Sequence, residues 1–346
     1  MSDFRIDQIT NQAGTAGPQV AGITTFSSTS GLLMPLGPTE YRGDRGRGIF
    51  GTRYSTPTSR NNIEYITIST AGNAFDFGDS SINRYALAAC SSSTRGVFGG
   101  GYITPAASNI IDYITISSTG NTFDFGDLTL ARYGNAALSN NIRGIFAGGI
   151  SAGPLAVSNI DFITISSLGN ASNFGSLYLR QRLSQACASP TRGVISSGYD
   201  APSATNVMQY ITISTLGDSI DFGDATQPRY APATASNSIR GVFGGGFNPS
   251  PLAAGVNTID YITIASTGDA IDFGDLTQLI YNASAVSSST RGVFGGGFNP
   301  SPLNVTVNTI DLVTIMSVGN ATDFGDLIQQ GSDVAGCSDA HGGLGD

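Results

Sequence analysis

The residues of this 346-residue chain that could do chemistry are mostly carboxylates, and all but Glu40 and Glu64 are aspartates. Two carboxyl groups suffice for glycoside hydrolysis, so an Asp-rich chain could host a glycosidase. Most of these aspartates, however, recur at fixed positions of a repeat, whereas a single site would use residues that break it. The recurring members are Asp112, Asp161, Asp260 and Asp311 in one series, and Asp79, Asp127, Asp224, Asp275 and Asp326 in another.

We therefore expect the recurring aspartates to be structural. Their short side chains can accept hydrogen bonds from turn backbone. They could also pair with the recurring arginines Arg95, Arg143, Arg192, Arg240 and Arg291. Calcium in Asp-lined turns is an alternative, although no recognised calcium loop is present.

Other catalytic motifs are incomplete. His341 is the only histidine, which argues against a Ser-His-Asp triad or a histidine metal centre. The FDFGD strings contain a kinase-like DFG, but the chain has no lysine and no HRD loop. The glycine triplets lack the GK[ST] continuation of a phosphate-binding loop. We predict no catalytic residue, no metal site and no cofactor.

Composition excludes further classes. A net charge of −9 and scattered arginines argue against a nucleic-acid partner, whose phosphates require clustered cations. No run of eighteen apolar residues exists, and residues 1–30 lack the order of a signal peptide, so we expect no membrane insertion. The cysteines Cys90, Cys187 and Cys337 occupy equivalent repeat positions, which predicts separate buried thiols.

One pattern of about fifty residues, centred on RGVFGGG and IDYITI, runs through the chain six times. Each unit contains four candidate strands, namely RGVFG, IDYITI, FDFGD and a run of small residues. IDYITI is bulky on both faces, so neighbouring sheets must cover it on both sides. We predict an all-β fold, a six-bladed propeller with repeats starting near residues 47, 95, 143, 192, 240 and 291.

The chain termini indicate how the ring closes. Residues 331–346 repeat only the small-residue strand and the turn after it. We expect residues 331–338 to supply the missing strand of the first blade, so that the propeller domain is 44–346 with a C-terminal clasp. Seven blades are the alternative, if this tail formed a separate blade with residues 39–51.

Residues 1–43 do not fit the period. They carry apolar side chains that a monomer would have difficulty burying, notably Ile6, Ile9, Val20 and Ile23. We interpret this segment as an extended arm for attachment to another protein or to copies of the same chain around a symmetry axis. A disordered leader is the alternative.

The loops after the glycines vary in length and polarity while the flanking strands stay constant, and variable loops on a rigid scaffold commonly bind ligands. Their aromatic and proline residues could present a rigid rim to a glycan or a protein, or pack on a neighbouring blade. The candidate interaction residues are Tyr102, Pro105, Pro154, Tyr199, Pro202, Phe247, Pro249, Phe298 and Pro300.

The repeat resembles the kelch repeat. It shares the strand ending in glycines (Gly244 to Gly246), the aromatics Tyr261 and Phe273, and an Arg before the next unit, as at Arg229. It departs from kelch in having Phe where Trp is usual. The resemblance implies a propeller of four-stranded blades.

A narrower resemblance covers nearly the whole chain. Phrases such as RGVFGGGFNPSP, NTIDYITIASTGDAIDFGDLTQ and AGCSDAHGGLGD are similar to virion-associated repeat proteins of marine tailed phages, especially cyanophages. This resemblance implies assembly on a virion and leaves the position on the particle open. Our preferred hypothesis is a non-enzymatic structural protein of a tail or capsid fibre, assembled in the host cytoplasm, that binds virion proteins and a host-surface glycan or protein. A glycan depolymerase on a propeller scaffold and a cellular kelch-type scaffold are the alternatives.

Overall fold

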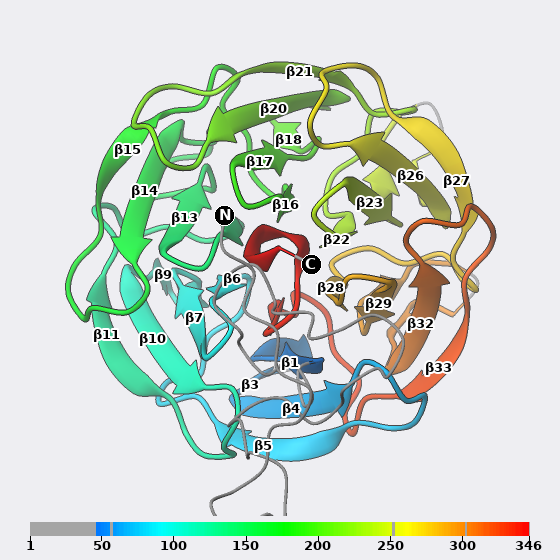
Figure 1. Ribbon diagram of the computed structural model, residues 1–346, viewed down its shortest axis with the longest axis horizontal. Coiled ribbons are helices and arrows are strands. Elements are labelled where there is room, and N and C mark those ends of the chain that lie inside the picture. The colour runs from blue at the N-terminus through cyan, green and yellow to red at the C-terminus, as the bar shows by residue number, and fades with distance from the viewer. Residues whose placement is uncertain (1–45, 56–57, 251–252, 302, 346) are drawn as a thin grey trace, which may run out of the picture. The chain divides into compact units, whose positions relative to one another are not determined.

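The computed structural model describes residues 46–346 except 56–57, 251–252, 302 and 346. The chain divides into two units, and the second, Arg45–Asp346, contains six four-stranded antiparallel sheets arranged as blades of a propeller (Figure 1). The predicted six-bladed all-β fold is confirmed. Each repeat arginine named above begins the second strand of its blade.

The four strands of each blade are given below in order from the central axis outwards. Blade I is β34 (Gly336–Ser338), β1 (Arg47–Phe50), β4 (Asn62–Thr67) and β5 (Phe75–Asp79). Blade II is β6 (Ala88–Ser91), β7 (Arg95–Gly99), β10 (Ile110–Thr115) and β11 (Phe123–Asp127). Blade III is β12 (Ala136–Ser139), β13 (Arg143–Ala147), β14 (Asn159–Thr164) and β15 (Ser172–Ser176).

The second half of the ring repeats this order. Blade IV is β16 (Ala186–Ala188), β17 (Arg192–Ile195), β20 (Val207–Thr212) and β21 (Ile220–Asp224). Blade V is β22 (Ala233–Ser236), β23 (Arg240–Gly244), β26 (Thr258–Thr263) and β27 (Ile271–Asp275). Blade VI is β28 (Ser284–Ser287), β29 (Arg291–Gly295), β32 (Thr309–Thr314) and β33 (Thr322–Asp326).

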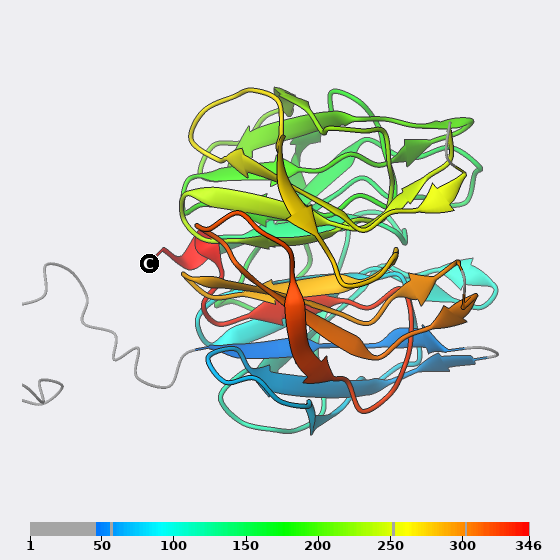
Figure 2. The same cartoon turned by 90° about the vertical axis from the view of Figure 1, so that its right-hand side faces the viewer.

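Short hairpins follow the glycines on one face of the ring, which we call the hairpin face. They are β2 (Arg53–Ser55) with β3 (Thr58–Arg60), β8 (Tyr102–Ile103) with β9 (Ala106–Ala107), β18 (Tyr199–Asp200) with β19 (Ser203–Ala204), β24 (Phe247–Asn248) with β25 (Ala254–Gly255), and β30 (Phe298–Asn299) with β31 (Val305–Thr306). The opposite face, here the tail face, holds Gly46 and the 3-10 helix η1 (Gly342–Leu344) (Figure 2).

The ring closes through its C-terminal strand. β34 pairs antiparallel with β1, placing Ser338 opposite Gly48 and Gly336 opposite Phe50. The strand lies within the segment expected to act as a clasp, and it completes blade I. The tail therefore forms no seventh blade.

The glycine of each RG pair makes room for a neighbouring blade. A side chain on the inner strand of one blade packs where this glycine of the next blade would carry a Cβ atom. The six contacts are Val286 on Gly48, Cys337 on Gly96, Cys90 on Gly144, Leu138 on Gly193, Cys187 on Gly241 and Ala235 on Gly292. The three cysteines are buried free thiols, as predicted, and burial raises the pKa of Cys187 and of Cys337 to about 12.

The substitution Gly193→Ala should lower the free energy of unfolding by about 1–3 kcal/mol, because the new methyl group falls on the Leu138 side chain. Denaturant titration would measure this loss. Gly153→Ala is the matched control, since a Cβ there meets no atom within 4 Å. Equal midpoints for the two variants would show that the close contact is unimportant.

The arginine of each RG pair ties its blade to the next. Its Nη1 donates a hydrogen bond of 2.6 to 3.1 Å to a backbone carbonyl of the following blade. The six bonds join Arg47 to Ile116, Arg95 to Ile165, Arg143 to Ile213, Arg192 to Ile264, Arg240 to Ile315 and Arg291 to Ile68. In five blades the guanidinium also lies 4.1 to 4.7 Å from the centroid of an aromatic ring. The expectation that these arginines pair with the recurring aspartates is wrong.

Candidate functional site

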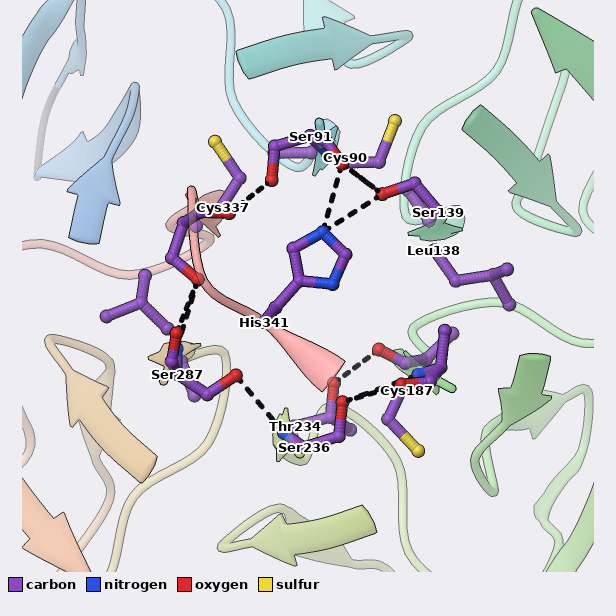
Figure 3. A pocket seen from close by; sticks show the side chains of 18 residues that line it. Cys90, Ser91, Leu138, Ser139, Cys187, Thr234, Ser236, Ser287, Cys337 and His341 are labelled. Atoms are coloured by element: carbon purple, nitrogen blue, oxygen red, sulfur yellow. Dashed lines mark hydrogen bonds between the residues drawn. The ribbon is translucent and has the colours of Figure 1, made fainter. Parts of the chain in front are cut away.

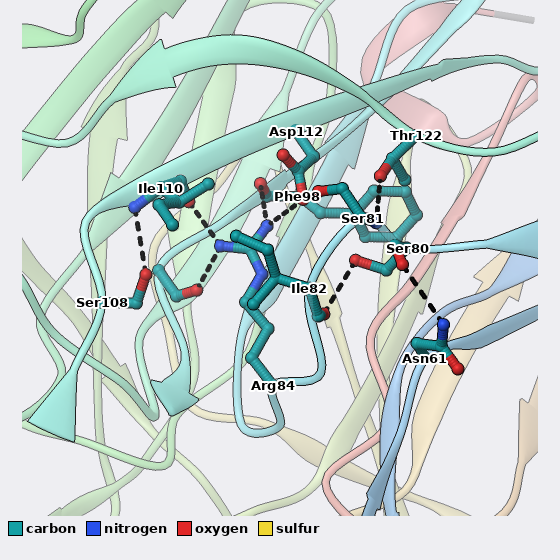
Figure 4. A network of polar contacts seen from close by, with 11 residues as sticks. Asn61, Ser80, Ser81, Ile82, Arg84, Phe98, Ser108, Ile110, Asp112 and Thr122 are labelled. Atoms are coloured by element: carbon teal, nitrogen blue, oxygen red, sulfur yellow. Dashed lines mark hydrogen bonds and ion pairs between the residues drawn. The ribbon is translucent and has the colours of Figure 1, made fainter. Parts of the chain in front are cut away.

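The recurring carboxylates of the third strand from the axis, β4 in blade I and its equivalents, are buried beside a different arginine series. Arg84 donates to Asp112 at 2.8 Å and to the carbonyls of Gly100, Ile110 and Phe98 (Figure 4). The four buried ion pairs are Arg53–Glu64, Arg84–Asp112, Arg132–Asp161 and Arg229–Asp260. Each of these four carboxylates is thus held in place by a buried counter-ion.

Blades IV and VI modify this pair in different ways. In blade IV both charges are replaced by amides, Gln181 and Gln209, which hydrogen-bond to Ser196 and Leu179. In blade VI the arginine is replaced by Ile280, and the buried Asp311 accepts hydrogen bonds from the Thr277 amide and hydroxyl, as Asp260 does from Thr226. Burial raises the pKa of Asp311, because no cation offsets the loss of hydration.

His341 lies in the mouth of the central channel on the tail face (Figure 3). Its Nε2 is 3.0 Å from the Ser91 carbonyl, and its Nδ1 accepts a hydrogen bond from the Gly343 amide. Nδ1 is therefore unprotonated and Nε2 carries the proton, so the ring is neutral. Burial lowers the pKa of His341, which also favours the neutral ring. The imidazole thus anchors the tail in a cavity of about 60 Å³ lined by small side chains.

The hairpin face carries a ring of aromatic side chains around the channel, which we call the aromatic belt. Each blade has two positions in this ring, one in the hairpin and one in the segment before the inner strand, joined by a backbone bridge, and nine of the twelve positions are aromatic. The belt consists of two arcs, Tyr54–Tyr85–Tyr102–Tyr133 and Tyr199–Tyr230–Phe247–Tyr281–Phe298, with successive ring centroids 4.9 to 5.6 Å apart. All nine rings are half-buried, so each keeps part of its surface in solvent.

A ring of backbone hydrogen bonds holds the belt in position. In each blade, the residue that follows the belt position before the inner strand has φ between 52° and 61°. Five of these six residues donate an amide hydrogen bond of 2.6 to 3.1 Å to the carbonyl of the equivalent residue in the preceding blade. The six residues are Ala86, Gly134, Leu183, Ala231, Asn282 and Asp333. Left-handed backbone at non-glycine residues persists only where surrounding contacts impose it, so the belt is rigidly placed.

The belt is interrupted at two places. Between blades VI and I, Ser332 takes the place of an aromatic residue and bridges Tyr54. Between blades III and IV, Ile150 and Arg182 take the aromatic positions, and the Arg182 guanidinium carbon lies 5.1 Å from the Tyr199 ring centroid. These two interruptions are the parts of the belt where the repeat is broken.

The aromatic residues predicted from the loops, Tyr102, Tyr199, Phe247 and Phe298, all lie in the belt. The prolines do not: Pro105, Pro154 and Pro202 are exposed at loop tips, Pro249 is half-buried, and Pro300 packs against Gly255 of the neighbouring hairpin. The proposed arm residues Ile6, Ile9, Val20 and Ile23 lie outside the described residues.

Sequence reasoning missed the second member of each belt pair. Tyr85, Tyr133 and Tyr230 directly follow the buried arginines, and Tyr281 follows Ile280. The recurring Arg-Tyr dipeptide was the available signal. Only the three-dimensional ring shows that Tyr85 contacts hairpins of two different blades, through Tyr54 and Tyr102.

No protein-family model matches this chain, and neither does any curated protein. Within residues 46–345, apart from the gaps given above, no three His, Cys, Asp or Glu side chains form a group that could hold a metal ion. No helix in the same described part is long and apolar enough to cross a membrane.

Asp333 makes the belt face sensitive to pH. Burial raises its pKa to about 6, against the hydrogen bond from Ser332 that stabilises the anion. The native state thus holds this proton more tightly than the unfolded chain, and stability should fall as pH rises from about 4 to about 6. The variant Asp333→Asn should remove roughly 1 to 2 kcal/mol of that fall, since the side chain is partly exposed.

Denaturant titrations of both proteins at pH 4, 5, 6 and 7 would measure the effect. Comparing the wild type with Asp333→Asn isolates the contribution of Asp333. Glu64, Asp112 and Asp311 also have raised pKa values, but they are present in both proteins. Asparagine fits the backbone, as Asn282 has the same φ of 55° at the equivalent position of blade VI. Parallel pH profiles would contradict the assignment.

Proposed function

We propose that this protein is a non-enzymatic structural component of a tailed-phage particle, part of a tail or capsid fibre, and that its belt face binds a host-surface glycan. The observation that carries the binding proposal is the aromatic belt, nine half-buried rings in two rigid arcs on one face. The phage assignment depends on the resemblance of the repeat sequence to virion-associated proteins of marine tailed phages.

The direction of the chain supports this arrangement. The described chain enters the propeller at Gly46 on the tail face, where Asp339 accepts a hydrogen bond from its amide at 2.8 Å. Residues 1–43, which we propose attach the protein to virion proteins or to copies of the same chain, precede Gly46 in the sequence. The hairpins that carry the belt lie on the opposite face, where a ligand could approach them (Figure 2).

Aromatic rings suit a glycan because they offer flat apolar surface with little conformational entropy to lose. A sugar ring presents C–H groups on one face and hydroxyls at its edge, so it can stack on a tyrosine and hydrogen-bond to its phenol. Successive rings about 5 Å apart would contact a polymer at several points.

Binding and hydrolysis make different predictions for the full chain. Incubated with dextran, alginate, carrageenan or polysaccharide extracted from host envelopes, the protein should bind at least one polymer and release no new reducing ends. Release of oligosaccharides would overturn the non-enzymatic proposal in favour of a depolymerase. Antibody labelling of intact particles should place the protein on the tail or the capsid surface, and its absence from particles would overturn the virion assignment.

A further inference from the structure

The interruption of the belt between blades III and IV carries an unpartnered positive charge. Thirteen of the sixteen arginines lie in the described part of the chain. Six join neighbouring blades and four are buried beside a carboxylate, so both sets have structural roles. The three that remain are Arg60, Arg180 and Arg182.

Two of these three, Arg180 and Arg182, lie two residues apart in the segment before the inner strand of blade IV. Arg180 forms an ion pair with Asp200 at 2.7 Å, in which the Arg180 side chain stays 46% exposed. Arg182 stacks on Tyr199 and forms no ion pair with any described residue, and its Nε is buried without a hydrogen-bond partner. Four of the other five blades have tyrosine at the position of Arg182, so this charge is specific to one place in the belt.

The geometry points to a subsite for an acidic sugar, in which the Arg182 guanidinium binds a carboxylate or sulfate group while the sugar ring stacks on the neighbouring belt aromatics. This inference rests on the proposed glycan-binding function and adds the class of ligand. A guanidinium presents a planar fork of donors that matches carboxylate and sulfate oxygens. Arg180 could contribute a second cation if the ligand competes with Asp200.

The charge of the whole protein makes this local cation necessary. At a net charge of −9, the protein repels an anionic polymer, and only a local positive group can reverse that repulsion at short range. Arg182 is half-buried against Tyr199, so its charge is screened less than that of a fully exposed arginine. Binding of an acidic glycan should therefore weaken as salt is added.

The test compares the full-length protein with two variants that each remove one positive charge from the hairpin face. Arg182→Tyr restores the residue found in four other blades and keeps an aromatic surface. Arg60→Gln removes an exposed arginine of β3 in blade I and is the matched control. The probes are alginate, which carries carboxylates, carrageenan, which carries sulfate esters, and neutral dextran.

We expect the wild type to prefer alginate or carrageenan over dextran, and whichever polymer it prefers identifies the acidic group. Arg182→Tyr should lower that affinity about tenfold, as loss of a charge-assisted hydrogen bond implies, and leave dextran binding unchanged. Arg60→Gln should bind like the wild type. Equal affinity of the wild type for acidic and neutral polymers, unaltered in Arg182→Tyr, would overturn this subsite and leave glycan binding standing. Binding to no polysaccharide at all would overturn the proposed function itself.

Discussion

Removing residues 336–346 should lower the free energy of unfolding by about 5 kcal/mol or more, the largest effect we expect from any change considered. The deletion removes β34, the inner strand of blade I, together with its pairing to β1. It also removes Cys337 from its contact with Gly96 and the hydrogen bond from Ser338 to the Ser287 carbonyl. Thermal unfolding followed by circular dichroism would measure the loss.

A shorter deletion separates the clasp from the tail beyond it. Truncation after Asp339 keeps β34 and the Asp339 hydrogen bond to Gly46, and removes residues 340–346, which include His341 and η1. Its effect should be clearly smaller. If the protein lacking residues 336–346 unfolded at the wild-type temperature, ring closure by this strand would not contribute to stability.

The substitution Arg84→Gln should cost about 3 to 5 kcal/mol, because it leaves Asp112 buried without its cation. Asp112→Gln should cost a similar amount, since the Arg84 charge then loses its counter-ion. The double variant should recover much of this loss, because blade IV contains Gln181 and Gln209 at these two positions. Denaturant titration of the four proteins gives the coupling energy directly.

Additivity would contradict this account of the pair. If the double variant lost the sum of the two single losses, Arg84 and Asp112 would act independently, and the amides of blade IV would not represent a compensated exchange. Near-complete recovery would explain how one blade of six lost both charges.

The fold could be predicted from the sequence because its signal repeats. Six copies of the RG strand and of IDYITI marked the blades, and an incomplete last unit marked the closing strand. The assignment of charge partners failed for a geometric reason. Across blade II, Asp112 lies opposite Phe98, whereas Arg95 lies opposite Thr115, three residues or about 10 Å further along the strand. Arg84 reaches Asp112 from a connecting segment whose path the sequence pattern does not reveal.

The candidate site was predicted only in part for a similar reason. The variable loops drew attention to Tyr102 and Phe247, but their partners Tyr85 and Tyr230 lie in segments before the inner strands. Each of these tyrosines also contacts a ring of the preceding blade, Tyr54 for Tyr85 and Tyr199 for Tyr230, and these contacts form only in the assembled ring. The charge at Arg182 gains its meaning only after the other arginines are assigned to structural contacts.

The most direct test of the belt is a binding isotherm of the full-length protein on envelope polysaccharide, compared with the variant Tyr85→Ser/Tyr230→Ser. Serine occupies the same position at Ser332, so the fold should tolerate it, and matched thermal unfolding would verify that. We predict at least about tenfold weaker binding by the variant, equivalent to roughly 1.4 kcal/mol. Equal affinity of the two folded proteins would contradict the claim that the aromatic belt is the binding surface.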